Sequence, residues 1–148
     1  MVENLSIVAA SAEDADELAT LRVDAMRPSL ELAGRFDSDR ARQRFLDGFN
    51  CDCTWKLIID RQLIGFYVWQ QGDSFIWLDH LYIRADFQGR GIASHVIRKL
   101  KQRAALQSGC IRLMALKGSA ANDFYLRHGF VVVEQQPLDN IYQWRVND

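Results

Sequence analysis

The sequence DHLYIRADFQGRGIASHVIRKL, residues 79–100, changes its pattern of apolar residues at a pair of glycines. β-branched and aromatic residues lead up to Ile83, as is typical of a strand, and from Ile92 apolar residues return at helical spacing. Between them lie Gly89 and Gly91, whose backbone amides carry little side-chain bulk and precede the positive end of a helix dipole. Such a loop suits phosphate oxygens. Glycines before a helix are also common as simple turn residues, so the loop alone leaves both interpretations open.

The residues before this stretch predict two helices and a series of strands. The segment Ser11 to Asp14 resembles a capping box, so the first helix is expected to begin near Ala12, and Pro28 is expected to end it. Charged residues with apolar side chains along one face predict a second helix over Asp37 to Phe49. β-branched and aromatic runs separated by short polar gaps predict strands over Leu5 to Ala10, Thr54 to Asp60, Leu63 to Gln70 and Ser74 to Ile83.

The residues after the stretch alternate between helix and strand patterns. The third helix is expected to end near Ser108-Gly109. One β-α-β crossover should place a parallel strand pair in a mostly antiparallel, mixed sheet of about seven strands with four helices, so the fold class is α+β. The remaining elements are expected as a strand over Ile111 to Leu116, a short helix over Ser119 to His128 closed by Gly129, and strands over Phe130 to Glu134 and Ile141 to Val146.

Length and charge restrict the organisation and the partners of the chain. With 148 residues, 49% of them hydrophobic and 25% charged, the sequence predicts a single domain over residues 1–148. A formal net charge of −1 provides no general attraction to nucleic acid or to an anionic membrane surface. The N-terminus lacks the basic start and apolar stretch of a signal peptide, and no apolar run approaches the length of a membrane span. We therefore expect a cytoplasmic protein without nucleic-acid or membrane partners.

The three cysteines, Cys51, Cys53 and Cys110, do not form a recognisable metal or disulfide pattern. Their number is odd, and the Cys51-x-Cys53 pair has no second pair or nearby histidines to complete a zinc site. Cys110 fits as small apolar filler in a strand. We expect reduced thiols without catalytic chemistry and no bound metal.

Two segments resemble the GNAT superfamily of N-acyltransferases. Residues 79–100 look like its acetyl-CoA-binding segment, whose signature Gln/Arg-x-x-Gly-x-Gly/Ala is matched by Gln88, Gly91 and Ala93. ANDFYLRHGF, residues 121–130, is similar to the downstream helix of the family, in which an Ala-x-x-aromatic-Tyr pattern precedes Gly-Phe and a strand. Together with the strand order, the resemblance covers nearly the whole chain. It implies a three-layer fold and acetyl-CoA as the acyl donor.

The resemblance assigns residues to the binding of coenzyme A. Many family members place an asparagine seven residues before the tyrosine of the downstream helix, where this chain has Gly118, and Asn122 is expected to substitute for it in part. The charged run Arg98, Lys99, Lys101 and Arg103 either contacts the adenosine 3′-phosphate or is a solvated helix face. Backbone groups of the strand are expected to pair with pantetheine and those of the loop to bind the pyrophosphate, which implicates Leu81, Tyr82, Ile83, Gln88, Gly89, Arg90, Gly91, Ile92 and Ala93.

The resemblance also assigns catalytic roles. Tyr125 matches the family's general acid, which would protonate the departing thiolate, although a tyrosine at this position can also simply pack in the core. The general base falls at Asp79, with His80 and water as alternatives and a structural role for Asp79 also open. The main-chain amide of Leu81 is expected to polarise the acyl oxygen.

The sequence thus predicts transfer of an acetyl group from acetyl-CoA to the primary amine of a small molecule, by direct attack through a tetrahedral intermediate. A protein or peptide acceptor and a CoA-binding sensor without turnover are the alternatives. Exposed strand edges near the C-terminus would permit a homodimer. The acceptor site of the family lies on the first helices and neighbouring strands, which offer Met26, Arg27, Glu31, Arg35, Phe36, Tyr67, Trp69 and Trp77, although each aromatic residue can equally belong to the core.

Overall fold

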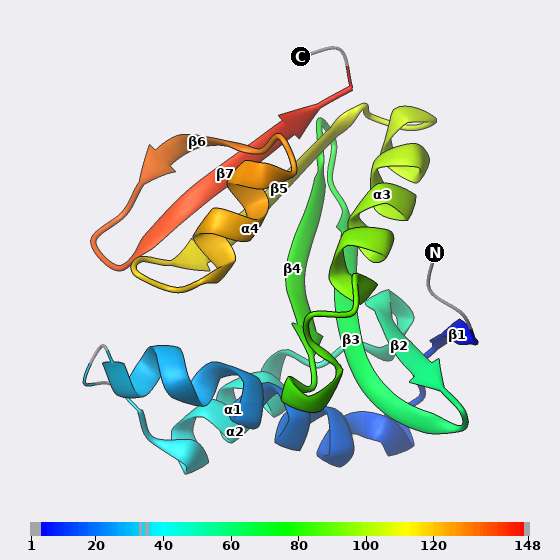
Figure 1. Cartoon of the computed structure of the whole chain (residues 1–148), viewed down its shortest axis with the longest axis vertical. Coiled ribbons are helices and arrows are strands. Elements are labelled where there is room, and N and C mark those ends of the chain that lie inside the picture. The colour runs from blue at the N-terminus through cyan, green and yellow to red at the C-terminus, as the bar shows by residue number, and fades with distance from the viewer. Residues whose placement is uncertain (1–3, 33, 35, 147–148) are drawn as a thin grey trace. The chain divides into compact units, whose positions relative to one another are not determined.

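Seven strands form one mixed sheet in a computed structural model that describes residues 4–32, 34 and 36–146 (Figure 1). The order of the strands across the sheet is β1-β2-β3-β4-β5-β7-β6. The strands are β1 (Leu5–Ala9), β2 (Thr54–Ile59), β3 (Gln62–Gln71), β4 (Ile76–Ile83), β5 (Cys110–Leu116), β6 (Val131–Gln135) and β7 (Asp139–Arg145). The helices are α1 (Ala15–Leu32), α2 (Ser38–Gly48), α3 (Ile92–Ala105) and α4 (Ala121–Arg127).

The strand directions confirm the predicted α+β fold class. β4 pairs with β5 in parallel, from Ile76 opposite Ile111 to Leu78 opposite Leu113. The pairs β1–β2, β2–β3, β5–β7 and β6–β7 are antiparallel. The parallel pair is the one that the crossover through α3 requires, because a helical connection returns the chain to the same end of the sheet.

The prediction that Pro28 ends the first helix is wrong. α1 continues to Leu32 with the proline inside it. The proline removes one backbone donor but leaves the following turn able to form. That last turn carries an exposed ion pair from Arg27 to Glu31, with 2.6 Å between Nε and Oε1, which adds modest support. A proline is therefore a weaker stop signal here than the continuing helical pattern.

The chain divides into two compact units. The described residues of Met1–Val68 and His80–Ala93 form the first, and those of Trp69–Asp79 and Ser94–Asp148 form the second. The core of the first unit is apolar and joins α1, α2 and β3 through Leu18, Ala19, Leu21, Phe45, Phe66 and Val68. The second unit buries the inner face of α3 through Val96, Ile97, Leu100 and Ala104.

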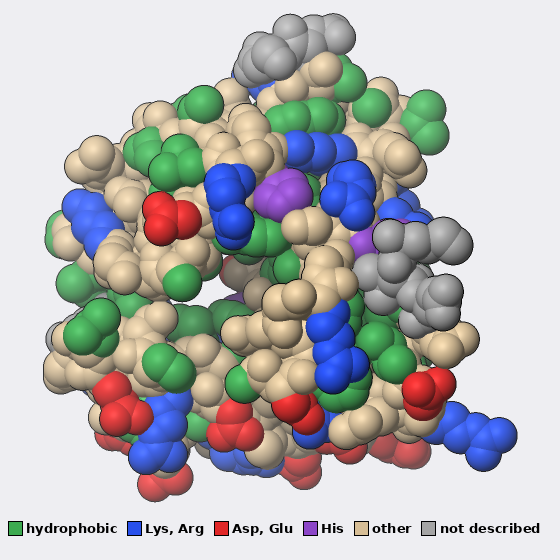
Figure 2. Space-filling view, in the orientation of Figure 1, with side chains coloured by type: hydrophobic (Ala, Val, Ile, Leu, Met, Phe, Trp, Pro, Cys, Tyr) green, Lys and Arg blue, Asp and Glu red, His purple; other side chains and the backbone are tan. Residues whose placement is uncertain are grey.

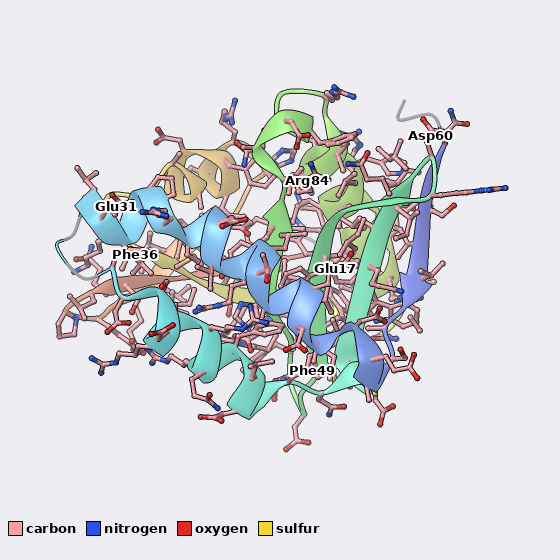
Figure 3. The ribbon with its side chains drawn as sticks, turned by 90° about the horizontal axis from the view of Figure 1, so that it is seen from below. Glu17, Glu31, Phe36, Phe49, Asp60 and Arg84 are labelled. Carbon is pink, nitrogen blue, oxygen red and sulfur yellow. The ribbon has the colours of Figure 1, made fainter. Side chains whose placement is uncertain are left out.

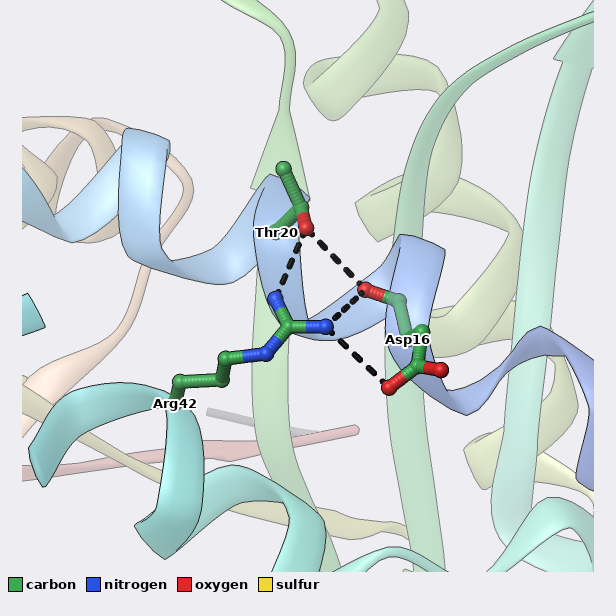
Figure 4. A network of polar contacts seen from close by, with 3 residues as sticks. All are labelled: Asp16, Thr20 and Arg42. Atoms are coloured by element: carbon green, nitrogen blue, oxygen red, sulfur yellow. Dashed lines mark hydrogen bonds and ion pairs between the residues drawn. The ribbon is translucent and has the colours of Figure 1, made fainter. Parts of the chain in front are cut away.

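A polar network on the surface of the first unit joins α1 to α2 (Figure 4). The guanidinium of Arg42 donates to the hydroxyl of Thr20 at 2.8 Å and to the carboxylate of Asp16 at 3.1 Å. A further bond of 3.2 Å reaches the Asp16 carbonyl. The two helices of this unit are thus linked by polar contacts at the surface as well as by the core beneath.

Gly65 of β3 allows a close approach of the β4 backbone within the first unit. A Cβ at this position would lie 2.4 Å from the carbonyl oxygen of Tyr82. We expect Gly65→Ala to lower the free energy of unfolding by about 2 kcal/mol or more, because the backbone must move apart. Urea unfolding followed by circular dichroism measures the change.

The matched control is Gly48→Ala at the end of α2, where an added Cβ meets no atom within 4 Å. This variant should be neutral or slightly more stable, because alanine favours a helix over glycine. Equal effects of the two substitutions would contradict the steric argument.

Candidate functional site

The glycine-rich loop lies in the first unit, directly before α3. Gly89 and Gly91 both have φ of +78°, the left-handed conformation that glycine adopts without strain. Both are exposed, and a Cβ on either would meet no atom within 4 Å beyond its chain neighbours. The loop therefore presents open backbone just before Ile92, where α3 begins with amides that have no acceptor within the helix.

The side chain of Gln88 anchors this loop to the end of β4. Its Nε2 donates to the carbonyl oxygen of Ile83 at 3.0 Å. The backbone amide of Phe87 donates to the carbonyl oxygen of Arg84 at 2.9 Å, and the backbone amide of Arg84 donates to the carbonyl oxygen of Ile64 in β3 at 2.7 Å. The glutamine of the signature thus fixes the path of the loop, a contact that the sequence pattern did not reveal.

The loop carries two arginines, which lie over one aromatic ring. The guanidinium of Arg90 lies over the ring of Phe87, with its Cζ 4.6 Å from the ring centroid. Arg84 lies over the same ring at 5.7 Å and pairs with Asp86 at 3.0 Å. Because Asp86 neutralises one of the two charges, Arg90 is the arginine better suited to an anionic ligand.

The end of β4 carries the predicted backbone groups Leu81, Tyr82 and Ile83, also in the first unit. The ring of His80 lies in an aromatic cluster there, 5.8 Å from the centroid of Phe45 and 6.3 Å from that of Phe66. Its Nδ1 lies 3.2 Å from the hydroxyl of Tyr82. His80 is thus a part-buried member of a packed cluster.

Asp79 precedes this segment on β4 and belongs to the second unit. It is exposed, and its Oδ1 accepts a hydrogen bond from the indole Nε1 of Trp77 at 3.3 Å. The contact places the side chains of Trp77 and Asp79 on one face of the strand, as residues two apart in a strand must be. Trp77 therefore orients the carboxylate predicted as the base.

Tyr125 is held by aromatic packing in the second unit. It lies on α4 with 8% of its surface exposed. Its ring centroid is 5.2 Å from that of Phe124, 5.6 Å from that of Phe130 and 6.1 Å from that of Tyr142. These contacts fix the ring, and so they restrict where its hydroxyl can lie.

Asn122, one turn before Tyr125, uses its carboxamide within the second unit. The Nδ2 donates to the carbonyls of Leu116 and Ser119, both at 2.9 Å. The Oδ1 accepts from the hydroxyl of Tyr142 at 2.7 Å and from Asn140 at 3.0 Å. The role of Asn122 in cofactor binding stays a prediction.

Cationic side chains gather over α3 and α4 in the second unit (Figure 2). Lys101 of α3 donates to the carbonyl oxygen of His128, the C-terminal cap of α4. Its Nζ also lies 5.6 Å from the ring centroid of Phe130 and 5.3 Å from that of Trp144. Burial lowers the pKa of Lys101. Lys101 is therefore more than a solvated charge, because it ties the end of α4 to α3.

His128 completes this attachment with its ring. The Nε2 lies 2.9 Å from the hydroxyl of Ser94, seven residues before Lys101 and so on the same side of α3. Burial is the largest cause that lowers the pKa of His128, and the charges of Lys101, Arg127 and Arg98 act in the same direction. The contacts of Ser94 and Lys101 with His128 were not predicted from the sequence, because they join two helices that are separate in the chain.

The predicted acceptor residues divide between surface and core. The described ones on α1 are near the C-terminal end of that helix, where Glu31 and Phe36 are seen in Figure 3. The guanidinium of Arg27 lies 4.9 Å from the Phe36 ring centroid. Tyr67 and Trp69 of β3 are buried. Arg35 lies outside the described residues.

The structure tests the prediction made for Cys110. Cys110 is fully buried in β5, which confirms it as apolar filler. All three cysteines are free thiols. In the part of the chain that the structure describes, no group of three or more His, Cys, Asp or Glu side chains is arranged to hold a metal ion. Within the same residues, every helix is too short or too polar to cross a membrane.

Comparison with known proteins gives both a family and a fold. A family model described as an acetyltransferase (GNAT) domain matches residues 51–132. The chain resembles the PaiA N-acetyltransferase of Thermoplasma acidophilum, solved with coenzyme A, with a TM-score of 0.79, 16% identity and coverage of 95% of this chain and 98% of that one. An acetyltransferase of Thermus thermophilus gives a TM-score of 0.77 at 17% identity, over 97% and 98% of the two chains. No curated protein matches the sequence.

Proposed function

Because the chain belongs to the GNAT family of acetyltransferases, we propose that it transfers the acetyl group of acetyl-CoA to the primary amine of a small molecule. The observation that carries the proposal is the loop with two left-handed glycines and a Gln88 anchor, directly before α3. The family match spans this loop and Tyr125 as well.

The residues present fit the acyl donor. Open backbone at Gly89 and Gly91, the first amides of α3 and the cation of Arg90 are suited to a pyrophosphate. The remaining residues assigned to the donor are Leu81, Tyr82, Ile83, Gln88, Ile92 and Ala93. Asn122, which the sequence predicted to help hold the cofactor, uses its carboxamide for hydrogen bonds within its own unit. The fold resembles that of the PaiA N-acetyltransferase with a TM-score of 0.79, and that protein was solved in complex with coenzyme A. This likeness supports acetyl-CoA as the donor.

We assign three groups to the reaction. Asp79, oriented by Trp77, removes the proton that the amine must lose when it attacks the acetyl carbon. The backbone amide of Leu81 donates to the acyl oxygen as negative charge develops on it. Tyr125 gives its hydroxyl proton to the thiolate that leaves. His80 is the second candidate for the base, but its ring is packed among Phe45, Phe66 and Tyr82.

We further propose that residues 1–148 act as a single N-acetyltransferase domain in the cytoplasm. The three free thiols support a reducing compartment. The edge strand β6 exposes Val131, Val132 and Val133, which supports a homodimer through that edge. The net charge of −1 supports the absence of nucleic-acid and membrane partners.

Thiol release from acetyl-CoA in the presence of an acceptor panel tests the function. The panel contains small primary amines, amino acids and peptides, and mass spectrometry identifies the acetylated product. We expect release that depends on a small amine and one acetylated product for each thiol. Propionyl-CoA in a parallel assay measures the preference for acetyl.

The other outcomes separate the alternatives. Acetylation confined to peptides would show a protein acceptor. Saturable binding of coenzyme A without thiol release from any acceptor would show a sensor and overturn the enzymatic proposal.

A further inference from the structure

The helix that carries Tyr125 is too short to be stable by itself. α4 has seven residues, and its N-terminal cap, Ala120, makes no side-chain hydrogen bond to the first turn. Isolated helices of this length are not stable in water, because forming the first turn fixes several backbone dihedral angles in return for a single hydrogen bond. Contacts to neighbouring elements must therefore determine where Tyr125 lies.

Asn122 makes more of these polar contacts than any other residue of α4 among the described hydrogen bonds. Its Nδ2 donates to the carbonyl of Leu116 in β5 and to that of Ser119 in the β5–α4 connection, each at 2.9 Å. Its Oδ1 accepts from Tyr142 at 2.7 Å and from Asn140 at 3.0 Å, both in β7. One side chain thus connects the first turn of α4 to two strands of the second unit.

The chemistry of these partners requires a carboxamide. Two partners are carbonyl oxygens, which need a donor, and two are donors, which need an acceptor. Asparagine supplies both from adjacent atoms, whereas aspartate would place an acceptor against the carbonyls and leucine would supply neither. Because the side chain is part-buried, a lost partner would leave an unsatisfied polar group.

Tyr142 connects this network to the predicted acid. It is 1% exposed, and burial raises its pKa, so the hydroxyl stays protonated and can donate to Asn122. The ring of the same residue contacts that of Tyr125, with 6.1 Å between centroids. A shift of Asn122 would therefore act on Tyr125 both through the helix and through the Tyr142 ring.

We propose that Asn122 is a positioning residue, which fixes α4 to β5 and β7 so that the hydroxyl of Tyr125 is held in place for protonation of the thiolate. This role rests on the proposed function, and it takes the place of the direct contact with the cofactor that was predicted for Asn122. A positioning role affects kcat, whereas a contact with the cofactor affects the KM for acetyl-CoA.

A double-mutant cycle between Asn122→Ala and Tyr125→Phe tests the proposal. Asn122→Ala should lower kcat by about tenfold to a hundredfold, because a displaced catalytic group loses much of its effect. The KM for acetyl-CoA should stay within about twofold of the wild type. In the Tyr125→Phe background the same substitution should have almost no further effect on kcat, because there is no hydroxyl left to position.

The matched control is Ser119→Ala, which removes only a 3.2 Å contact from the Ser119 hydroxyl and leaves the four other bonds of Asn122. Its kcat should stay within about twofold of the wild type. A raised KM with unchanged kcat in Asn122→Ala, or a loss that multiplies with that of Tyr125→Phe, would overturn the proposal. Full turnover of Tyr125→Phe alone would instead refute the acid role.

A second measurement does not depend on turnover. Amide hydrogen exchange over residues 121–127 should be faster by about tenfold or more in Asn122→Ala than in the wild type, and unchanged in Ser119→Ala. Unchanged exchange in both variants would overturn the proposal even if no acceptor were found. If Asn122→Ala does not fold, Asn140→Ala is used in its place, because it removes one donor to the Oδ1 of Asn122 and leaves the sequence of α4 unchanged. Its kcat and its amide exchange over residues 121–127 are then compared with those of the wild type and of Ser119→Ala.

Discussion

A Tyr125→Phe variant is expected to lose about a hundredfold or more of kcat with the amine acceptor. The substitution removes only the hydroxyl, and general-acid assistance to a leaving group typically contributes about 10² to 10⁴ in rate. The affinity for coenzyme A should be unchanged, because binding is assigned to the loop before α3. Steady-state kinetics with acetyl-CoA, combined with calorimetric binding of coenzyme A, separates the two quantities.

The control for this prediction is Leu126→Ala on the same helix. Leu126 is 51% exposed, so its truncation alters α4 without opening the core. This variant should keep kcat within about twofold of the wild type. In Tyr125→Phe the ring keeps its packing against Phe124, Phe130 and Tyr142. Urea unfolding should therefore give a free energy of unfolding close to that of the wild type. Unchanged turnover in a folded Tyr125→Phe protein would leave that packing as the only role of Tyr125.

A Gly91→Val variant is expected to bind coenzyme A about tenfold more weakly or worse. Gly91 has φ of +78°, which a residue with a Cβ adopts at a cost of roughly 1–2 kcal/mol, and more when it is β-branched. The loop is expected to relieve this strain by changing its backbone, which would displace the amides proposed to bind the pyrophosphate. Since about 1.4 kcal/mol corresponds to a tenfold change in affinity, calorimetry resolves the effect.

The matched control is Gly34→Val between α1 and α2. Gly34 has a similar φ of +70°, and a Cβ there also meets no atom within 4 Å. It therefore carries the same backbone strain without being part of the loop before α3. Gly34→Val should reduce stability slightly and leave the affinity for coenzyme A unchanged. Equal losses of affinity in the two variants would show that general destabilisation, and not the loop, is responsible.

The order of helices and strands could be predicted because each element has a clear period of apolar residues. The switch from alternating to helical spacing around Ile83 and Ile92 identified the crossover, and the crossover fixed the parallel strand pair. The predicted end of α1 was wrong. A proline affects only its own turn of the helix, whereas the turn beyond Pro28 is supported by the ion pair of Arg27 with Glu31 and by the contact of Arg27 with the ring of Phe36. Helix ends depend on such contacts, which no single residue specifies.

Within the candidate site, the backbone conformation of the glycine-rich loop was predictable from its residue types. Gly89 and Gly91 have the left-handed φ values that a glycine-rich loop allows. The contacts made by long polar side chains were not predictable. Lys101 was expected to be either a phosphate ligand or a solvated charge, and it binds the His128 carbonyl. Such contacts link residues far apart in the chain, so they follow only once α3 and α4 are packed.

The bond from Gln88 to the carbonyl of Ile83 has a consequence for the thermodynamics of donor binding. A loop that is already tied to its strand loses its conformational freedom during folding and not when each donor molecule arrives. The entropy of ordering is then absent from the dissociation constant, and less of the intrinsic contact energy is needed to reach a given affinity. For the proposed acetyl-CoA site, whose occupant must enter and leave in every catalytic cycle, a preorganised loop reaches a given affinity with fewer contacts.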